Sequence, residues 1–208
     1  MLRAAKGVTL IELLVAVSLI FLVILALTNI DIFGRTMVIS SSNRALLQNE
    51  LSTALEHISK NIVHATGDQL LVLNRPIQML TNGFRVRVDP RVTPTQTLQD
   101  LNDDVFYSYT LTGNTLSVSC APAALCPIAD QVLSTHILEG FVNGIMPTAT
   151  ALIPASPGFY VFLPPADNAT TVEVGLVARF DPNNPVVGVN NPQIQMKNRM
   201  HTPNAPAS

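Results

Sequence analysis

The sequence predicts an α+β protein in which one long N-terminal helix packs on an antiparallel β-sheet domain. Three observations lead to this prediction. An apolar run occupies residues 8–27, an amphipathic helical pattern occupies residues 32–66, and short β-rich runs separated by Pro, Gly and Asn fill residues 67–200. The 208 residues have room for one membrane helix and one domain of about 140 residues.

The apolar run is long enough to cross a membrane. Residues 8–27 contain only Leu, Ile, Val, Phe and Ala apart from Thr9, Glu12 and Ser18. At about 1.5 Å per residue, a helix of this length spans roughly 30 Å, the thickness of the hydrocarbon core of a bilayer. We therefore predict a transmembrane helix over residues 8–31.

The residues on either side of this run predict its orientation in the membrane and whether it is removed from the mature protein. Arg3 and Lys6 precede it, and basic residues favour the cytoplasmic side, so the rest of the chain is expected outside the cytoplasm. A secretory signal peptide would need an apolar stretch of about 7 to 15 residues that ends in a small-residue cleavage site. Residues 28–31 contain no such site, so we expect the segment to remain in the mature protein.

Glu12 is a carboxylate inside the apolar run. Such a group disfavours membrane insertion by about 2 to 3.5 kcal/mol, and it often marks a function or a partner. Alternatively, Glu12 lies close enough to the cytoplasmic end to reach the headgroups, where the helix N-terminus also favours negative charge.

The order of Lys6, Gly7 and an apolar run that opens with Val-Thr-Leu-Ile-Glu resembles the prepilin signal of type IV pilins and type II secretion pseudopilins. The resemblance implies that a membrane prepilin peptidase cuts between Gly7 and Val8 and releases a leader of residues 1–7. It also implies N-methylation of Val8, a position where the family most often has Phe. Glu12 would then pair with the Val8 amine of a neighbouring subunit and fix the register of the filament.

The second part of the helix, residues 32–66, carries one apolar stripe. Residues 32–65 contain no proline and only one glycine, Gly34, so the helix can continue beyond the membrane. Gly67 with Asp68 predicts its end. The stripe, which we expect to pack on the sheet as in the pilin-like fold, consists of Leu47, Leu51, Leu55, Ile58 and Ile62.

Residues 67–200 are expected to form the antiparallel sheet domain. Residues 84–88 alternate apolar residues with Arg85 and Arg87, which predicts a buried apolar face and an exposed face with both arginines. Gly113-Asn114 predicts a tight hairpin turn. The other predicted strands are 104–111, 115–120, 131–133, 136–142, 158–163, 171–180 and 193–200, and the proline-rich tail 201–208 is expected to be disordered.

The order of these pieces supports a finer resemblance over residues 44–200. A helix with QNELSTALEHISKNIVHATG, a YSYTLTGNTLSVS hairpin, ADQVLSTHILEGFV, a VEVGLVARF strand and a closing MKNRM are similar to the PilW-like minor pilins and to the related GspJ-like pseudopilins.

The two cysteines, Cys120 and Cys126, lie six residues apart in SCAPAALCPI. In an oxidising compartment this spacing predicts a local disulfide, worth roughly 2 to 2.5 kcal/mol for so short a loop. A metal site would need two more ligands, and the loop contains no His and no third Cys.

We find no motif for catalysis, metal binding or a cofactor in the sequence, and we predict that the protein is not an enzyme. Glu50, His57 and His64 recur every seven residues and are interpreted as solvated helix positions. His136 and His201 stand alone in the sequence.

Two polar clusters are interpreted as solvated turns. Residues 100–104, which include Asp100, Asn102, Asp103 and Asp104, offer oxygen ligands for calcium, but they lack the glycine and the terminal glutamate of an EF-hand. Residues 181–185, with Asp181, Asn183 and Asn184 around two prolines, read as a turn by the same reasoning.

Composition argues against direct binding of nucleic acid. The chain has 12 basic and 14 acidic side chains, a net charge of −2, and leaving out Arg3 and Lys6 lowers the basic count to 10 and the charge to −4. Trp is absent and aromatic residues are few, so a base-stacking face has no support.

The resemblance to pilins implies a minor pilin that primes a type IV pilus or lies just beneath its tip. Its implied partners are other minor pilins, the major pilin, the prepilin peptidase and an inner-membrane assembly platform. It would be stored in the inner membrane with a periplasmic domain and then enter the filament. Two alternatives stay open: a minor pseudopilin of a type II secretion system, and a single-span protein whose periplasmic domain binds a ligand.

Overall fold

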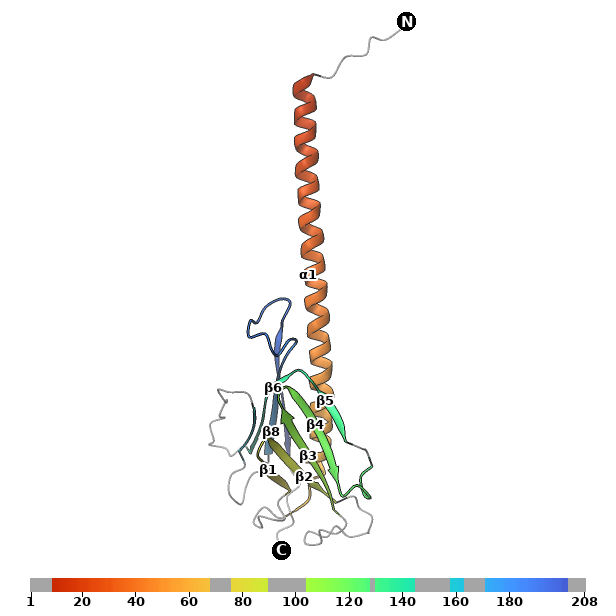
Figure 1. The fold of residues 1–208 in the computed structure, drawn as a ribbon, viewed down its shortest axis with the longest axis vertical. Helices are drawn as coiled ribbons and strands as arrows, with labels where there is room; N and C mark the ends of the chain where they lie inside the picture. The colour runs from red at the N-terminus through yellow and green to blue at the C-terminus, as the bar shows by residue number, and fades with distance from the viewer. Residues whose placement is uncertain are drawn as a thin grey trace.

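The structure is a computed structural model of the chain, and it describes residues 9–67, 76–89, 104–127, 130–144, 158–162 and 171–201. These residues form one helix and two sheets, which confirms the predicted α+β class (Figure 1). The elements are α1 (Leu10–Val63), β1 (Ile77–Leu80), β2 (Gly83–Val88), β3 (Val105–Thr112), β4 (Thr115–Ala121), β5 (Gln131–Ser134), β6 (Ile137–Gly144), β7 (Gly158–Phe162), β8 (Thr171–Arg179) and β9 (Gln193–His201).

Helix α1 runs without interruption for 54 residues, about 80 Å, as its lack of proline predicts. It ends at Val63, before the predicted stop at Gly67. The chain turns extended there because Ala65 forms a β-bridge with Val88 of β2. The helix therefore ends where the chain that follows it pairs with β2.

The N-terminal part of α1 stands clear of the sheets (Figure 1). Its large apolar side chains from Leu10 to Ile39 are exposed. This part of α1 is long and apolar enough to cross a membrane. The exposure is what a segment embedded in lipid or in other apolar helices would show in an isolated chain.

The C-terminal part of α1 packs on both sheets. The predicted apolar stripe is confirmed, because all its members are buried in one core with side chains from the two sheets. Ala54 joins the stripe and allows the sheet to approach the helix closely. The helical residues in this core are Leu47, Leu51, Ala54, Leu55, Ile58 and Ile62.

Leu51→Ala is expected to lower the free energy of unfolding of the sheet domain by about 2 to 5 kcal/mol, because Leu51 is fully buried between helix and sheet. Urea unfolding of the detergent-solubilised protein, followed by circular dichroism, measures this change. Leu46→Ala is the matched control, since Leu46 is exposed on the same helix and should change stability by less than about 1 kcal/mol. Equal effects of the two substitutions would show that the stripe does not hold the helix to the sheets.

The strands form two sheets, whereas the sequence analysis expected one. The first sheet has the order β1-β2-β3-β4-β5 and the second the order β7-β6-β8-β9. The chain passes from one sheet to the other through Thr135 and His136. The alternation of apolar and polar residues predicted the strands but not this division. Each strand alternates in the same way whichever sheet it joins.

One strand pair departs from the predicted antiparallel arrangement. Strand β7 pairs parallel with β6, while all other pairs are antiparallel within the described parts of the chain. Residues 145–157 connect β6 to β7, and a parallel pair needs a connection of about a dozen residues or more, which this segment supplies.

The β3–β4 hairpin is confirmed, with Gly113 and Asn114 between the strands. Gly113 has a φ of 58°, a left-handed conformation that glycine adopts without steric cost. The short strand β1 was not predicted. At the other end of the domain β9 continues to His201, which the sequence analysis placed in the tail.

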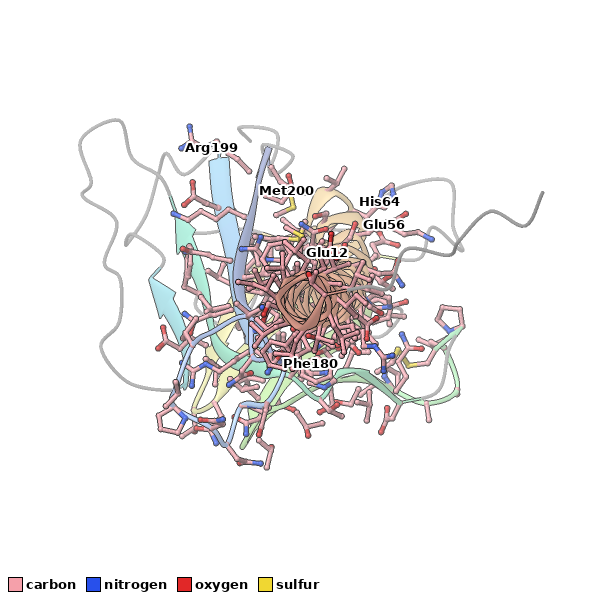
Figure 2. The ribbon with its side chains drawn as sticks, turned by 90° about the horizontal axis from the view of Figure 1, so that it is seen from above. Glu12, Glu56, His64, Phe180, Arg199 and Met200 are labelled. Atoms are coloured by element: carbon pink, nitrogen blue, oxygen red, sulfur yellow. A yellow bond between two sulfur atoms is a disulfide. The ribbon has the colours of Figure 1, made fainter. Side chains whose placement is uncertain are left out.

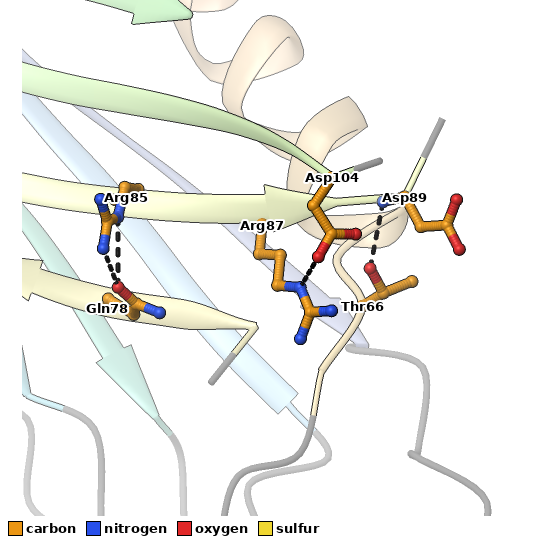
Figure 3. Close-up of polar contacts among 6 residues, drawn as sticks. All are labelled: Thr66, Gln78, Arg85, Arg87, Asp89 and Asp104. Atoms are coloured by element: carbon orange, nitrogen blue, oxygen red, sulfur yellow. Dashed lines mark hydrogen bonds and ion pairs between the residues drawn. The ribbon is translucent and has the colours of Figure 1, made fainter. Parts of the chain in front are cut away.

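The prediction that Arg85 and Arg87 share an exposed face is wrong. Arg87 is fully buried, and its Nε donates to a carboxylate oxygen of Asp104, which is also fully buried (Figure 3). Arg85 is half-buried; its Nε donates to Oε1 of Gln78 at 3.1 Å, and its guanidinium lies 4.8 Å from the centre of the Phe106 ring. A charged residue can occupy a buried strand position when a partner of opposite charge is buried beside it.

Candidate assembly site

The assembly site expected from the sequence consists of Gly7, Val8 and Glu12, and the structure places one of the three. Gly7 and Val8 lie outside the described residues. Glu12 lies in the first turn of α1, close to the exposed N-terminal end of the helix (Figure 2). The predicted cleavage and methylation therefore remain predictions.

The Glu12 carboxylate folds back onto the start of its own helix. Its Oε2 accepts hydrogen bonds from the backbone N and from Oγ1 of Thr9, both at 2.9 Å, while the Glu12 backbone N donates to Thr9 Oγ1 at 3.3 Å. This capping box stabilises the helix start. It also holds the negative charge of Glu12 beside Thr9, the residue directly after Val8.

The surface around Glu12 is apolar. A shallow depression of about 310 Å³ lies along one side of the helix, with Glu12 among otherwise apolar lining residues: Ile11, Val15, Ala16 and Leu19. The small side chain of Ala16 leaves a hollow between the larger side chains. A carboxylate in such surroundings interacts strongly with a positive group that reaches it, because little water screens the charge once the surface is covered.

Exposed apolar side chains continue beyond the length that a bilayer core covers. Ile30, Ile32, Phe33, Met37, Val38 and Ile39 are all exposed. Among them Asp31 and Arg35 form an ion pair of 3.0 Å, which neutralises the two charges of this stretch. From Leu27 to Ile39 the helix extends about 18 Å, so a bilayer core that covered residues 8–27 would leave most of these side chains uncovered.

The predicted disulfide between Cys120 and Cys126 is confirmed. It joins the end of β4 to the loop that follows, and both sulfur atoms pack near the edge of the core. It lies far along the chain from Glu12 and stabilises the sheet domain locally.

The interpretation of Glu50 as a solvated helix position and of His136 as an isolated residue is wrong. The Nδ1 of His136 lies 2.9 Å from Oε2 of Glu50, and the same oxygen accepts a hydrogen bond of 2.7 Å from Ser134 Oγ. The His136 ring also stacks on Phe180. This contact ties α1 to the short connection between the two sheets.

His57 also differs from the prediction, because it is half-buried against the first sheet. Its Nδ1 lies 2.9 Å from the Tyr109 hydroxyl, which also accepts a 2.7 Å hydrogen bond from Asn61 Nδ2. Burial, reinforced by the positive charge of Lys60, lowers the pKa of His57, and burial raises the pKa of Tyr109. His64 is exposed just after the helix, as predicted.

The two polar clusters have different outcomes. Residues 100–103 lie outside the described residues, and Asp104, which was expected in a solvated turn, is buried against Arg87. The turn at residues 181–185 is confirmed, with the Asn184 N bonded to the Asp181 carbonyl at 3.2 Å. In the described part of the chain, no group of three or more His, Cys, Asp or Glu could hold a metal ion.

Comparison of the chain with models of protein families, with curated proteins and with solved structures gave no match.

Three polar contacts were not found by sequence reasoning: Arg87 with Asp104, Glu50 with His136, and His57 with Tyr109 and Asn61. Each joins residues far apart in sequence. The sequence carried one usable signal, since His57 and Asn61 are four apart and therefore share the side of the helix that faces β3.

Proposed function

We propose that this chain is a minor pilin, a structural subunit that is processed at Gly7 and assembles near the tip of a type IV pilus. In this proposal prepilin peptidase cuts between Gly7 and Val8, and Val8 is then methylated. The exposed part of α1 packs among the apolar helices of other minor pilins and of the major pilin. The sheet domain forms the outer surface of the filament.

The observation that carries the proposal is the division of α1 into two parts. Its C-terminal part is buried on the sheets, whereas its apolar side chains from Leu10 to Ile39 are exposed over a length that exceeds a bilayer core. A simple membrane anchor needs only the first 20 or so of these residues. Packing against other helices in a filament would cover the whole length.

The proposed mechanism uses charge pairing in an apolar environment. Cleavage after Gly7 creates a positive amine at Val8, and the Glu12 of a neighbouring subunit pairs with it. Each charge alone would be unfavourable in the filament core, so only the register that brings the two together is stable. Before assembly, Thr9 satisfies the Glu12 carboxylate through the capping box.

Glu12→Ala and Glu12→Gln are expected to leave leader cleavage unchanged and to lower incorporation into purified filaments on the order of 100-fold. The reason is that each variant leaves the partner amine unpaired in apolar surroundings. Immunoblots of purified filaments and of the membrane fraction measure the two quantities. Ser18→Ala is the matched control, because Ser18 is another polar residue of the exposed helix and its Oγ donates to the carbonyl of Leu14 within the same helix. Normal incorporation of both Glu12 variants would contradict the charge-pairing mechanism.

A minor pseudopilin of a type II secretion system is the second candidate. A pseudopilin would assemble by the same helix packing and the same pairing of Glu12 with an amine. The exposed helix and Glu12 therefore support this candidate equally. Native filaments that contain this chain together with major pilin favour the first candidate. Loss of protein secretion with normal pili in a strain that lacks the chain favours the second.

A further inference from the structure

The loop of residues 180–192, which connects β8 to β9, lies beside α1, and we call it the β8–β9 loop. Within the described part of the sheet domain, it is the segment that extends furthest toward the N-terminal, apolar end of the helix (Figure 1). One hydrogen bond fixes its height along the helix, since Asn43 Nδ2 donates to the Asn190 carbonyl at 3.3 Å.

The side chain of Asn191 holds the β8–β9 loop in a fixed shape. Asn191 is buried, and its Nδ2 donates to the carbonyl oxygens of Asp181, Asn184 and Val186 at 3.0 to 3.2 Å. Its Oδ1 accepts from the Asp181 backbone N at 2.7 Å. The backbones of Asn191 and Gly188 also exchange two hydrogen bonds of 3.1 Å. The loop is therefore ordered by its own contacts.

The middle of this loop is apolar, exposed and uncharged. Residues 185–189 read Pro-Val-Val-Gly-Val, and Val186, Val187 and Val189 are 68, 56 and 55% exposed. Asn184 and Asn191, at its two ends, already bond to the loop backbone. Single exposed valines are ordinary on a protein surface, but three within four residues of an ordered loop are typical of a contact with a membrane or a protein.

The charges of α1 indicate where a bilayer would lie along it. Glu12 and Asp31 bracket residues 13–30, which are uncharged and extend about 27 Å, close to the thickness of the hydrocarbon core. The exposed ion pair of Asp31 with Arg35 then lies in the outer headgroup layer. Because this layer adds about 5 to 8 Å, its outer surface is level with about residues 34–36 of the helix.

The β8–β9 loop reaches the same level. Val187 precedes Asn190 by three residues, so the backbone can carry it about 10 Å from the bond with Asn43 toward the span. A distance of about 10 Å along α1 corresponds to six or seven residues, which places the valines level with about residues 36–37. A tilt of about 20° toward the loop, the average for membrane helices, brings the valines closer to the lipid.

We propose that the β8–β9 loop rests on the outer surface of the lipid bilayer that α1 crosses, with Val186, Val187 and Val189 in the headgroup layer. Every chain that inserts α1 brings this lipid surface to the level of the loop, whereas a protein partner would have to be supplied. The tip carries no charge that lipid phosphates would repel. The contact gives the sheet domain a second attachment and fixes its orientation above the membrane.

This inference goes beyond the proposed function, because it concerns the chain in the membrane and holds whether or not the chain enters a filament. It requires only that α1 spans the bilayer, for which the helix is long and apolar enough.

A fluorophore at Val187→Cys tests the contact in the full chain, reconstituted into vesicles of phosphatidylethanolamine and phosphatidylglycerol. The two native cysteines are joined to each other, so the introduced thiol is the only free one. A lipid with a nitroxide on its headgroup quenches a fluorophore that lies in the headgroup layer. We expect strong quenching at Val187→Cys.

Val132→Cys is the matched control, because Val132 is 59% and Val187 56% exposed, and Val132 lies on β5 of the other sheet. We expect little quenching of a fluorophore at this position. Equal quenching at the two positions, or none at Val187→Cys, would overturn the proposal.

Substitution of two valines tests whether their apolar side chains make the contact. With the fluorophore at Val189→Cys, Val186→Asp together with Val187→Asp is expected to lower the quenching about tenfold, an effect of about 1.4 kcal/mol, because the new carboxylates favour water. Val186→Leu together with Val187→Leu is the conservative variant and should keep the quenching. Circular dichroism checks that both variants fold. Unchanged quenching in the aspartate variant, or its loss in the leucine variant, would contradict the proposed contact.

Salt distinguishes this apolar contact from a contact driven by charge. Raising the ionic strength from about 0.1 to 1 M shortens the Debye length from about 10 to 3 Å. We expect no change in quenching at Val187→Cys, because the tip carries no charge. A loss of quenching at high salt would show that charged groups hold the domain to the membrane, against the proposal.

Another protein molecule on the loop would give a different result. Quenching that depends on the ratio of protein to lipid, or disulfide-linked dimers of Val187→Cys, would show that a second copy covers the valines and would overturn the proposal. None of these measurements depends on removal of residues 1–7. The lipid contact and the proposed function can therefore fail separately.

Discussion

A Gly7→Val variant is expected to accumulate with its leader attached and to be absent from filaments. In the proposed function the peptidase cuts directly after Gly7, and a β-branched side chain at this position would displace the peptide bond to be cut. A displacement of about 1 Å can lower a catalytic rate on the order of 100-fold. Immunoblots that separate the full-length and processed forms measure this effect.

Ala5→Val is the matched control for Gly7→Val. It places the same side chain in the leader, two residues before the cleavage position. We expect normal processing of this variant. Equal processing of both variants, with normal filaments, would show that residues 6–8 are not a peptidase site.

An Arg87→Met variant is expected to lose about 3 to 5 kcal/mol of folding free energy. The substitution keeps an unbranched side chain but leaves the buried Asp104 carboxylate without its guanidinium. Urea unfolding of the solubilised protein measures the loss. The Arg87→Met, Asp104→Leu double variant should be more stable than Arg87→Met alone, because it also removes the buried carboxylate that has lost the Arg87 guanidinium.

Arg85→Met is the control for this prediction. Arg85 lies two residues earlier on β2 and is half-buried, with Gln78 as a hydrogen-bond partner. Because solvent still reaches the side chain, its loss should cost about 1 kcal/mol or less. Similar losses of folding free energy in Arg85→Met and Arg87→Met would contradict the prediction that burial of the Arg87–Asp104 pair makes Arg87 more important for stability than Arg85.

The helix was predicted well because its signals are local. The apolar run, the absence of proline and the spacing of Leu47, Leu51 and Leu55 all act within a few turns of one helix. Its C-terminal end was predicted less well, since the bridge between Ala65 and Val88 ends the helix and joins residues far apart in sequence. The hairpin at Gly113-Asn114 was predicted because its turn chemistry is equally local.

The division into two sheets and the buried charges could not be predicted from the sequence. Arg87 alternates with apolar residues in the same way as Arg85, and only the position of Asp104 in space distinguishes them. The His136 contact with Glu50 likewise depends on how the connection between the sheets meets the helix. Single-sequence patterns give the periodicity of an element but not which distant group faces it.

Around the candidate site, too, some features could be predicted from the sequence and others could not. Glu12 was found from the sequence because a carboxylate is unexpected in an apolar run. The capping box with Thr9 could also be read from spacing, as Thr9 precedes Glu12 by three residues. The contact of α1 with the loop after β8 could not be predicted, because it joins residues more than 140 positions apart, as in the hydrogen bond from Asn43 to Asn190.

The mass and N-terminal sequence of the intact protein, purified from its own host, test the central claim most directly. We predict a chain that begins at Val8 and carries one added methyl group on its amine. In a chain that begins at Met1, the Val8 nitrogen is a neutral peptide amide and offers Glu12 no charged amine to pair with. That result would contradict the proposed assembly mechanism and would favour a membrane-anchored periplasmic domain.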